Sequence, residues 1–168
     1  MDMVEQRTLL ADFAAAYAPL EKALTGIDAA LLAYVPREPA DAWSINDHLV
    51  HLLDADMMLW YRARVSVAEP GSAIPVWQES TWRERLAYGS MDGPACLALA
   101  VVVRRTMARG FEAFVGGDWS GYAIVHPVRG TMGLADVLRL YRDHAGIHLA
   151  YVERNMRVFG ERAFGEGG

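Results

Sequence analysis

Apolar residues recur at intervals of three and four along four long segments of the chain, the spacing that gathers them on one face of an α-helix. The segments run from about residue 4 to 24, 45 to 67, 94 to 115 and 134 to 159. The recurring positions of the last segment are Leu134, Val137, Leu138, Tyr141, His144, Ala145, His148 and Val152. Helices of about 20 to 26 residues suit an antiparallel bundle, so the pattern predicts an all-α fold, a four-helix bundle.

Capping residues mark where two of these helices begin. Ser44 precedes the second segment and Asp47 follows three residues later, which is close to a capping box. Asp92 stands two residues before Pro94, and proline is favoured in the first turn of a helix. These signals predict sharp starts for the second and third helices. Inside the second helix, only Asp56 interrupts the apolar stripe.

The connections between the helices contain the turn-forming residues proline and glycine. Residues 69–80 and 118–132 are the two long connections, and short helical turns are expected over residues 28–34 and 81–88. The apolar pair at 124–125 is too short to predict a strand. Both long connections exceed what a helical hairpin needs, which leaves room for crossover connections.

The length of 168 residues suits one domain with a single core. We expect the bundle over residues 1–160 and a flexible tail over residues 161–168, where glycine is frequent. The single cysteine, Cys96, lies in an apolar run, which predicts a small buried core residue. One cysteine cannot form an internal disulfide, and this agrees with a reducing compartment.

Charge and hydropathy argue against two classes of partner, nucleic acids and membranes. The net charge is −5, and no basic run exceeds the pair Arg104–Arg105, which argues against a nucleic-acid-binding surface. No apolar stretch approaches the roughly 20 residues that span a bilayer. The first residues are polar and do not resemble a secretion signal. We therefore expect a cytoplasmic protein without a membrane partner.

Two histidines on the apolar stripe of the last helix are candidate metal ligands. His144 and His148 are four residues apart, so both lie on one helix face and can bind one ion. The alternative is a pair of hydrogen-bonded core histidines. A zinc-protease motif is excluded, because Ala145 stands where that motif needs its glutamate.

A third ligand has to come from another helix of the bundle. His48 and His51 lie one turn apart on the second helix, and the apolar stripe runs between their directions. Their spacing therefore does not decide which of them faces the core. His126 precedes Pro127 in a loop, where a surface or hydrogen-bonded histidine is the expected role.

Two stretches of this sequence together resemble the DinB/YfiT-like superfamily, a damage-inducible family distinct from the DNA polymerase of similar name. In the first, Trp43 and Ser44 open a helix, and His51 follows the tryptophan by eight residues. The second stretch and the positions after it are His126, Pro127, Gly130, Leu134, Leu138, Tyr141, His144 and His148. Gly133 departs from the threonine or serine usual before the last helix, and Asp56 replaces a frequent glutamate.

The resemblance implies a bundle with crossover topology, often a homodimer, that binds a divalent ion, commonly zinc or nickel, on three histidines. Carried over by position, these ligands are His51, His144 and His148, with His48 as a neighbour of the site. Three protein ligands leave coordination positions open, which is typical of catalytic rather than structural sites.

Two enzyme chemistries on a small-molecule substrate follow from such a site. The preferred one is attack by a low-molecular-weight thiol on an electrophile, because the resemblance includes bacillithiol and mycothiol transferases and a thiol-dependent isomerase. The other is hydrolysis of an amide or similar bond. Candidate proton-transfer groups are Asp54, Asp56, Tyr141 and Asp143, and the carboxylates expected to orient a histidine are Asp47 and Asp143.

Two readings without catalysis remain open. The protein binds a metal or small ligand without turnover, or the histidines are core residues and no metal binds. A cleft lined by residues 69–80 and 118–132 would favour an enzyme, and Trp77, Trp82 and Trp119 are candidates to line it.

Overall fold

The computed structural model describes residues 1–40 and 42–165, most of which are helical. The α-helices are α1 (Met3–Ala15), α2 (Ala18–Ala23), α3 (Ala29–Ala33), α4 (Ile45–Ala68), α5 (Glu79–Arg85), α6 (Gly93–Phe111) and α7 (Leu134–Gly165). Short 3₁₀ turns lie at Tyr88–Ser90, Glu112–Phe114 and Trp119–Gly121. The strands are β1 (Ser72–Ala73), β2 (Ala123–His126) and β3 (Gly130–Gly133).

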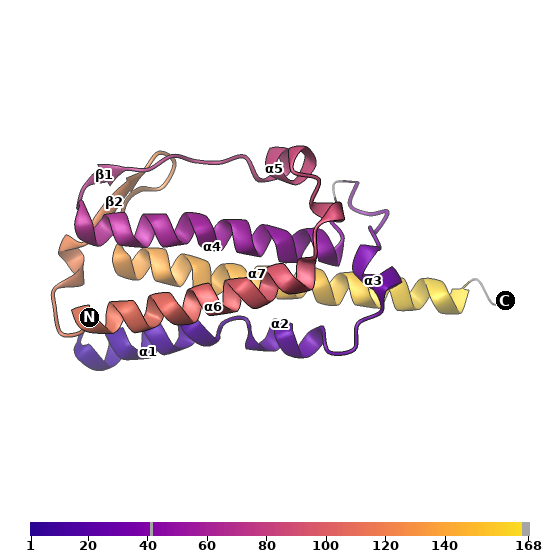
Figure 1. Cartoon of the computed structure of the whole chain (residues 1–168), viewed down its shortest axis with the longest axis horizontal. Helices are drawn as coiled ribbons and strands as arrows, with labels where there is room; N and C mark the ends of the chain where they lie inside the picture. The colour runs from indigo at the N-terminus through magenta and orange to yellow at the C-terminus, as the bar shows by residue number, and fades with distance from the viewer. Residues whose placement is uncertain (41, 166–168) are drawn as a thin grey trace.

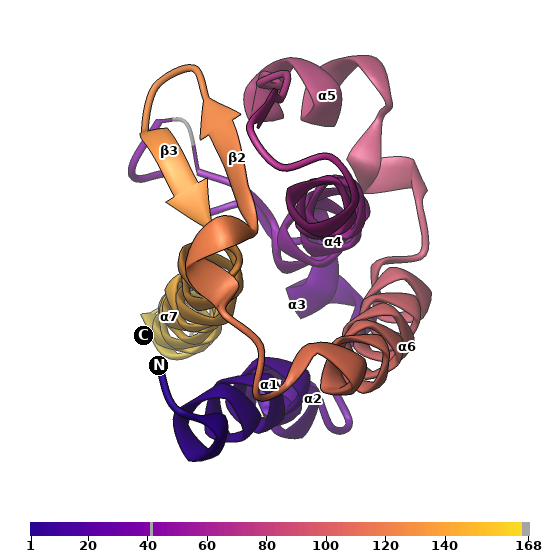
Figure 2. The ribbon, with the colours of Figure 1, turned by 90° about the vertical axis from the view of Figure 1, so that its left-hand side faces the viewer.

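Four helices, α1, α4, α6 and α7, form the corners of a bundle (Figure 2). α4 packs against α6 and α7, and α1 packs against the same two helices. α1 and α7 run in one direction along the bundle, whereas α4 and α6 run in the other (Figure 1). The chain therefore returns along the bundle between α4 and α6, through β1 and α5. This arrangement confirms the predicted four-helix bundle with crossover connections.

The helix starts follow the capping signals in the sequence. The Ser44 hydroxyl accepts the Asp47 N–H at 3.0 Å, and the Asp47 carboxylate accepts the Ser44 N–H at 3.2 Å, which completes a capping box. Asp92 accepts the N–H of Ala95 at 3.0 Å and begins α6. The predicted first helix is divided after Ala15, because Pro19 has no N–H to donate and its ring clashes with the carbonyl four residues earlier.

A small sheet corrects the prediction that the chain has no strand. β2 and β3 form an antiparallel hairpin in which His126 lies opposite Gly130, and β1 joins β2 in parallel with Ser72 beside Ile124. Gly130 has a φ of +71°, the left-handed conformation that glycine adopts at no steric cost. The strands are two to four residues long, too short for an alternating pattern to appear in the sequence.

The last helix is longer than the sequence predicted. α7 continues to Gly165, past the expected end near Phe159, so its regular structure enters the predicted tail. Residues 166–168 of that tail lie outside the described residues. The flexibility of the tail stays a prediction.

Apolar side chains from all four bundle helices fill the core. Phe13, Leu49, Leu59, Ala100 and Val152 are fully buried, and Cys96 is buried as predicted. The opposite faces of the helices are exposed and carry most of the charged residues, although Leu99 and Val102 of α6 and Ile147 of α7 are also exposed. Within the described ranges, no helix combines the length and the apolar character needed to cross a membrane.

A buried ion pair lies at the centre of this core and explains the polar break in the α4 stripe. The Arg104 guanidinium donates from Nε and Nη2 to the two Asp56 carboxylate oxygens at 2.8 and 2.9 Å, and both side chains are fully buried. Nη2 also donates to the Tyr141 backbone carbonyl at 2.9 Å. The guanidinium lies 3.8 Å from the centre of the Tyr17 ring. One side chain of α6 thus connects α4, α7 and the segment between α1 and α2.

Removing the acidic partner of this pair should destabilise the fold strongly. Asp56→Ala leaves a buried guanidinium without a counter-charge, and such changes cost about 3–5 kcal/mol in the free energy of unfolding. Urea denaturation followed by circular dichroism measures the loss. Asp143→Ala is the matched control, because Asp143 is exposed, and it should change stability by less than about 0.5 kcal/mol. Equal effects of the two substitutions would contradict a structural role for the buried pair.

Candidate metal centre

Three histidine side chains converge between α4 and α7. Nε2 of His144 lies 3.3 Å from Nε2 of His51 and 3.0 Å from Nε2 of His148. Each ring offers one nitrogen, and the three nitrogens lie within 4.8 Å of one another. His51 and His148 are buried, and His144 is half-buried. The structure thus brings together the three residues that the resemblance selects as ligands.

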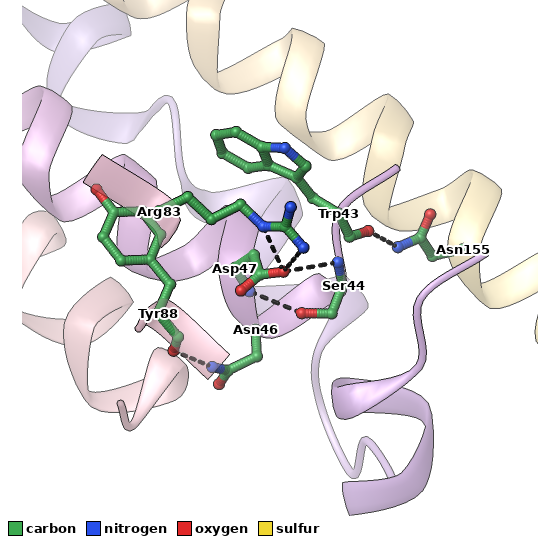
Figure 3. Close-up of polar contacts among 7 residues, drawn as sticks. All are labelled: Trp43, Ser44, Asn46, Asp47, Arg83, Tyr88 and Asn155. Atoms are coloured by element: carbon green, nitrogen blue, oxygen red, sulfur yellow. Dashed lines mark hydrogen bonds and ion pairs between the residues drawn. The ribbon is translucent and has the colours of Figure 1, made fainter. Parts of the chain in front are cut away.

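Contacts at the start of α4 hold the two helices in the register that this convergence requires. Asn155 of α7 donates to the Trp43 backbone carbonyl at 2.8 Å, directly before the first turn of α4 (Figure 3). Arg83 of α5 donates to the Asp47 carboxylate at 3.0 Å, so the capping residue also tethers α5. The first turn of α4 is therefore fixed to both neighbouring elements before the chain reaches His51.

A buried amide ties the same turn to α6. The Asn46 side chain donates to the Tyr88 carbonyl at 2.9 Å (Figure 3) and to the Met91 carbonyl at 3.1 Å, and it accepts the Gly93 N–H at 3.0 Å. A Cβ atom at Gly93 would lie 2.5 Å from Oδ1 of Asn46, so this close approach requires glycine. The start of α6 is thereby locked to the start of α4.

Burial keeps the clustered imidazoles neutral at physiological pH. It lowers the pKa of His51 to about 3, with smaller contributions from His144 and His48. It lowers the pKa of His144 to about 4, with Arg104 adding to the effect. The pKa of His148 is also lowered, chiefly by burial. Metal ligation needs unprotonated ring nitrogens, so the electrostatic state of the cluster fits a divalent ion.

Protons alone cannot satisfy the convergent nitrogens. A neutral imidazole has one N–H, and two Nε2 atoms that face each other need one donor and one acceptor. His144 faces two such partners at once, and its Nδ1 and that of His51 are buried without a hydrogen-bond partner in the described part of the chain. A cation between the three Nε2 atoms would satisfy all of them, and the donor set is one that zinc and nickel accept.

A fourth histidine supports the cluster from behind. Nδ1 of His148 lies 3.0 Å from Nδ1 of His48, which is also buried. If Nε2 of His148 is left free for a metal, its proton sits on Nδ1 and is donated to His48. Ligand histidines commonly have such a partner, which sets their tautomer and orientation. His48 thus lies beside the site, where the sequence analysis expected a neighbour.

Aromatic rings surround the imidazoles. Trp77 stacks on His51 with ring centres 5.3 Å apart, and Trp43 meets the same ring edge-on at 5.3 Å. Trp82 packs against Trp77, with ring centres 4.7 Å apart. The third predicted tryptophan, Trp119, is instead buried in the core, where its indole donates to the Phe114 carbonyl at 2.9 Å. Trp77 therefore lies at the site with Trp82 behind it, and Trp119 does not.

Two cavities open beside the cluster. The hairpin cavity, of about 590 Å³, lies against the β2–β3 hairpin and is lined by Arg62, Trp77, Glu79, His126, Tyr141 and His144, among others. The Trp43 cavity, of about 500 Å³, is lined by Trp43, His48, Glu79, His144, His148 and Arg154, among others. His144 and Glu79 border both. Residues 69–80 and 118–132 were expected to form a cleft over the site. Of these, residues from 76–80 and from the β2–β3 hairpin line the two cavities.

Only one of the four predicted proton-transfer residues reaches these cavities. Tyr141 lines the hairpin cavity, and its ring centre is 6.1 Å from that of His144. Asp54 instead accepts a hydrogen bond from the Tyr88 hydroxyl, and Asp56 is used by Arg104. Asp143 is exposed and pairs with Arg142 at 2.8 Å.

The predicted orienting carboxylates are also placed elsewhere. Asp47 binds Ser44 and Arg83, and Asp143 lies at the surface, so neither forms a hydrogen bond to a ring of the cluster. His48 has that position instead. His126 caps the hairpin turn by accepting the N–H groups of Val128 and Arg129 at 3.2 and 3.3 Å, so it is a hydrogen-bonded loop histidine as expected, although it also lines the cavity.

Two charged residues beside the cluster, Arg62 and Glu79, were not predicted from the sequence. Arg62 is 6% exposed and follows His51 by eleven residues, or three helical turns, on α4. This spacing places both residues on the same buried face, so it could have identified Arg62 as a residue near the site. Glu79 is the first residue of α5 and borders both cavities. No periodicity marks Glu79, because it reaches the site from a connection. Burial raises its pKa, and the charge of Arg62 opposes this shift.

Replacing the supporting histidine should weaken metal binding. His48→Phe keeps a ring in place but removes the acceptor for His148, so we expect a loss of about 10- to 100-fold in zinc affinity. Competition against a chromogenic chelator measures this change. His126→Ala is the control and should bind zinc as the parent does. An unchanged affinity in the His48 variant would show that His48 does not orient the ligand.

The buried imidazoles also predict an acid-sensitive apoprotein. The unfolded chain takes up protons near pH 6.5, the ordinary histidine pKa, whereas the native cluster stays neutral to about pH 4. Stability is therefore complete above pH 6.5 and falls with decreasing pH, by at most about 1.4 kcal/mol per pH unit for each histidine. Urea titrations of EDTA-treated protein at pH 7, 6 and 5 test this. Equal stability at these three values would contradict burial of neutral histidines.

Comparison with known proteins identifies the family of the chain. The sequence profile of the DinB superfamily matches residues 12–152. A Bacillus licheniformis protein named "putative metal-dependent hydrolase" is 24% identical over 119 residues, which cover 70% of this chain and 67% of that protein.

A solved structure has the same architecture. YfiT from Bacillus subtilis, described as "a probable metal-dependent hydrolase with an unusual four-helix bundle topology", matches with a TM-score of 0.84 and 20% identity. The match covers 95% of this chain and 90% of YfiT, and it confirms the bundle topology. Because the family profile spans most of the sequence, this chain belongs to the DinB superfamily.

Proposed function

We propose that this protein is a divalent-metal-dependent enzyme that hydrolyses an amide or similar bond of a small molecule. His51, His144 and His148 are the proposed ligands. The observation that carries the proposal is the convergence of three imidazole nitrogens, one of them from His144, which lines a cavity together with the carboxylate of Glu79. The two relatives are described as a "putative metal-dependent hydrolase" and "a probable metal-dependent hydrolase", and these descriptions support the same chemistry here.

The chain supplies the surroundings that such a reaction needs. A divalent ion on the three imidazoles contributes Lewis acidity, which activates water at neutral pH and polarises an electrophile. His48 holds the ring of His148, and Trp43 and Trp77 cover His51 and shield it from bulk water. Glu79 is an exposed residue that lines both cavities, and partial desolvation raises the pKa of its carboxylate, so it is suited to take a proton from water and return it to the leaving group.

Thiol transfer is the second candidate, and the paired cavities favour it. The hairpin cavity and the Trp43 cavity meet at His144, so two reactants can approach the cluster from separate sides. A low-molecular-weight thiol in one cavity and an electrophile in the other would suit a metal that activates a thiolate.

The proposal also includes the identity of the metal, the oligomeric state and the cellular location. Zinc or nickel is expected, because imidazole suits both ions. A homodimer is expected from the family resemblance, and a cytoplasmic location from the sequence as a whole. A surface for nucleic acid is not expected, given a net charge of −5.

Reconstitution separates the two chemistries. Protein stripped with EDTA and reloaded with zinc or nickel is assayed on chromogenic amides and esters, with and without a low-molecular-weight thiol. Hydrolysis by the loaded protein alone, lost in His148→Ala, supports the hydrolase. Product formed only with thiol supports thiol transfer. A loaded protein that is inactive in every combination would leave metal binding without the proposed catalysis.

Substitution of Glu79 by glutamine tests whether its carboxylate acts as the proton acceptor in the proposed hydrolysis. Glu79→Gln keeps the shape of the side chain but cannot accept a proton, so kcat should fall by about 10²- to 10⁴-fold with metal content unchanged. Glu84→Gln on the same helix is the control and should keep full activity. An unchanged kcat in the Glu79 variant would remove Glu79 from the mechanism.

A further inference from the structure

The hairpin cavity carries an unusual charge at one wall. Arg62 is 6% exposed, yet it forms no ion pair among the residues that the structure describes. Its Nη1 donates to the Tyr141 hydroxyl at 2.8 Å and its Nη2 to the Pro75 carbonyl at 3.1 Å, both neutral acceptors. Its Nε is buried without a partner. This guanidinium is held in place by neutral groups, and no carboxylate among the described residues is in ion-pair contact with it.

Comparison with the other buried arginine, Arg104, shows that Arg62 lacks a carboxylate partner. Arg104 is also buried, and both Asp56 oxygens accept its hydrogen bonds at 2.8 and 2.9 Å. A buried charge without such a partner is costly, and proteins ordinarily pair it. Arg62 lacks that partner although it lines a cavity of about 590 Å³, which has room for one to enter from solution.

The remaining charges of the cavity leave it positive. Arg129 of the hairpin turn adds a second guanidinium to its lining, and Glu79 adds one carboxylate. Burial, Arg62 and Arg129 together lower the pKa of His126, so this ring is neutral at physiological pH. Without the metal, two arginines and one glutamate give the lining a net charge of about +1, which one monoanionic group balances, and a divalent ion at His144 would make the cavity more positive still.

We propose that the hairpin cavity binds the carboxylate of a small organic acid on Arg62, with the rest of that molecule extending to His144. A guanidinium matches the planar geometry of a carboxylate, and each Nη of Arg62 still has one N–H to donate. The Tyr141 hydroxyl bonds Arg62, and its ring lies 6.1 Å from the His144 ring, so one small molecule can span both groups. This inference rests on the proposed function and names its substrate class: amides or related derivatives that carry a free carboxylate.

Matched probes test the inference by calorimetry. Phenylacetate and its neutral isostere phenylacetamide are titrated into metal-loaded and EDTA-treated protein. We expect phenylacetate to bind at least about tenfold more tightly in both forms, because a charge-assisted contact is lost with the amide. In the EDTA-treated protein, inorganic phosphate should bind more weakly than phenylacetate. Equal affinity for phenylacetate and phenylacetamide, or tighter binding of phosphate to the EDTA-treated protein, would overturn the assignment of a carboxylate site.

Variants locate the binding to one side chain. Arg62→Met should abolish the preference for phenylacetate, and Arg64→Met, an exposed arginine on the same helix, should retain it. Arg62→Lys keeps the charge without the planar fork and should bind with intermediate affinity, which provides a second variant if the methionine form does not fold. A preference that survives in the Arg62 variants, or that disappears with the metal, would place the carboxylate elsewhere and overturn the inference.

The test of the carboxylate site and the test of the proposed hydrolase can give different results. Carboxylate binding in EDTA-treated protein does not depend on turnover, so it can hold even if no hydrolysis is found. Conversely, hydrolysis of neutral amides without any preference for phenylacetate would support the enzyme and reject the carboxylate site.

Discussion

The Arg104 guanidinium is the contact on which the arrangement of the helices depends. It binds the Asp56 carboxylate of α4 and the Tyr141 carbonyl of α7, and it lies over the Tyr17 ring. Asp56 follows His51 by little more than one turn, and Tyr141 precedes His144 by three residues. The same guanidinium therefore fixes the register of the two helices that carry the histidine cluster. Because hydrogen bonds are directional, this register is defined more sharply than apolar packing alone would define it.

The site places several polar groups where a bundle core is usually apolar. Four imidazoles, two of them on each helix, lie in an interior that keeps them neutral. Burying these groups without partners costs free energy, and a bound cation would remove much of that cost. The buried positive charge of Arg62, which lies nearby, would instead be compensated by a bound anion. The proposed cation site and the proposed anion site border one cavity, and together they would suit a substrate with a carboxylate at one end and a reactive bond at the other.

Local signals in the sequence were sufficient for the main helices but not for the site. Periodicity and the Ser44 cap predicted α4, and the spacing of His144 and His148 indicated their shared face. Spacing could not choose between His48 and His51; family resemblance chose His51, and the structure buries both. Arg62 and Glu79 were missed, because their importance depends on a connection folding over the bundle. The hairpin was missed because its strands are only four residues long, and the third strand that completes the sheet, β1, lies some fifty residues earlier in the chain.

The central claim is that His51, His144 and His148 together hold one divalent ion. Elemental analysis of tag-free protein, beside His148→Ala and His126→Ala, tests it most directly. The account predicts about one equivalent of zinc or nickel in the parent and in the His126 variant, and a large loss in the His148 variant. A parent protein without metal after incubation with both ions, or a His148 variant that retains a full equivalent, would contradict it.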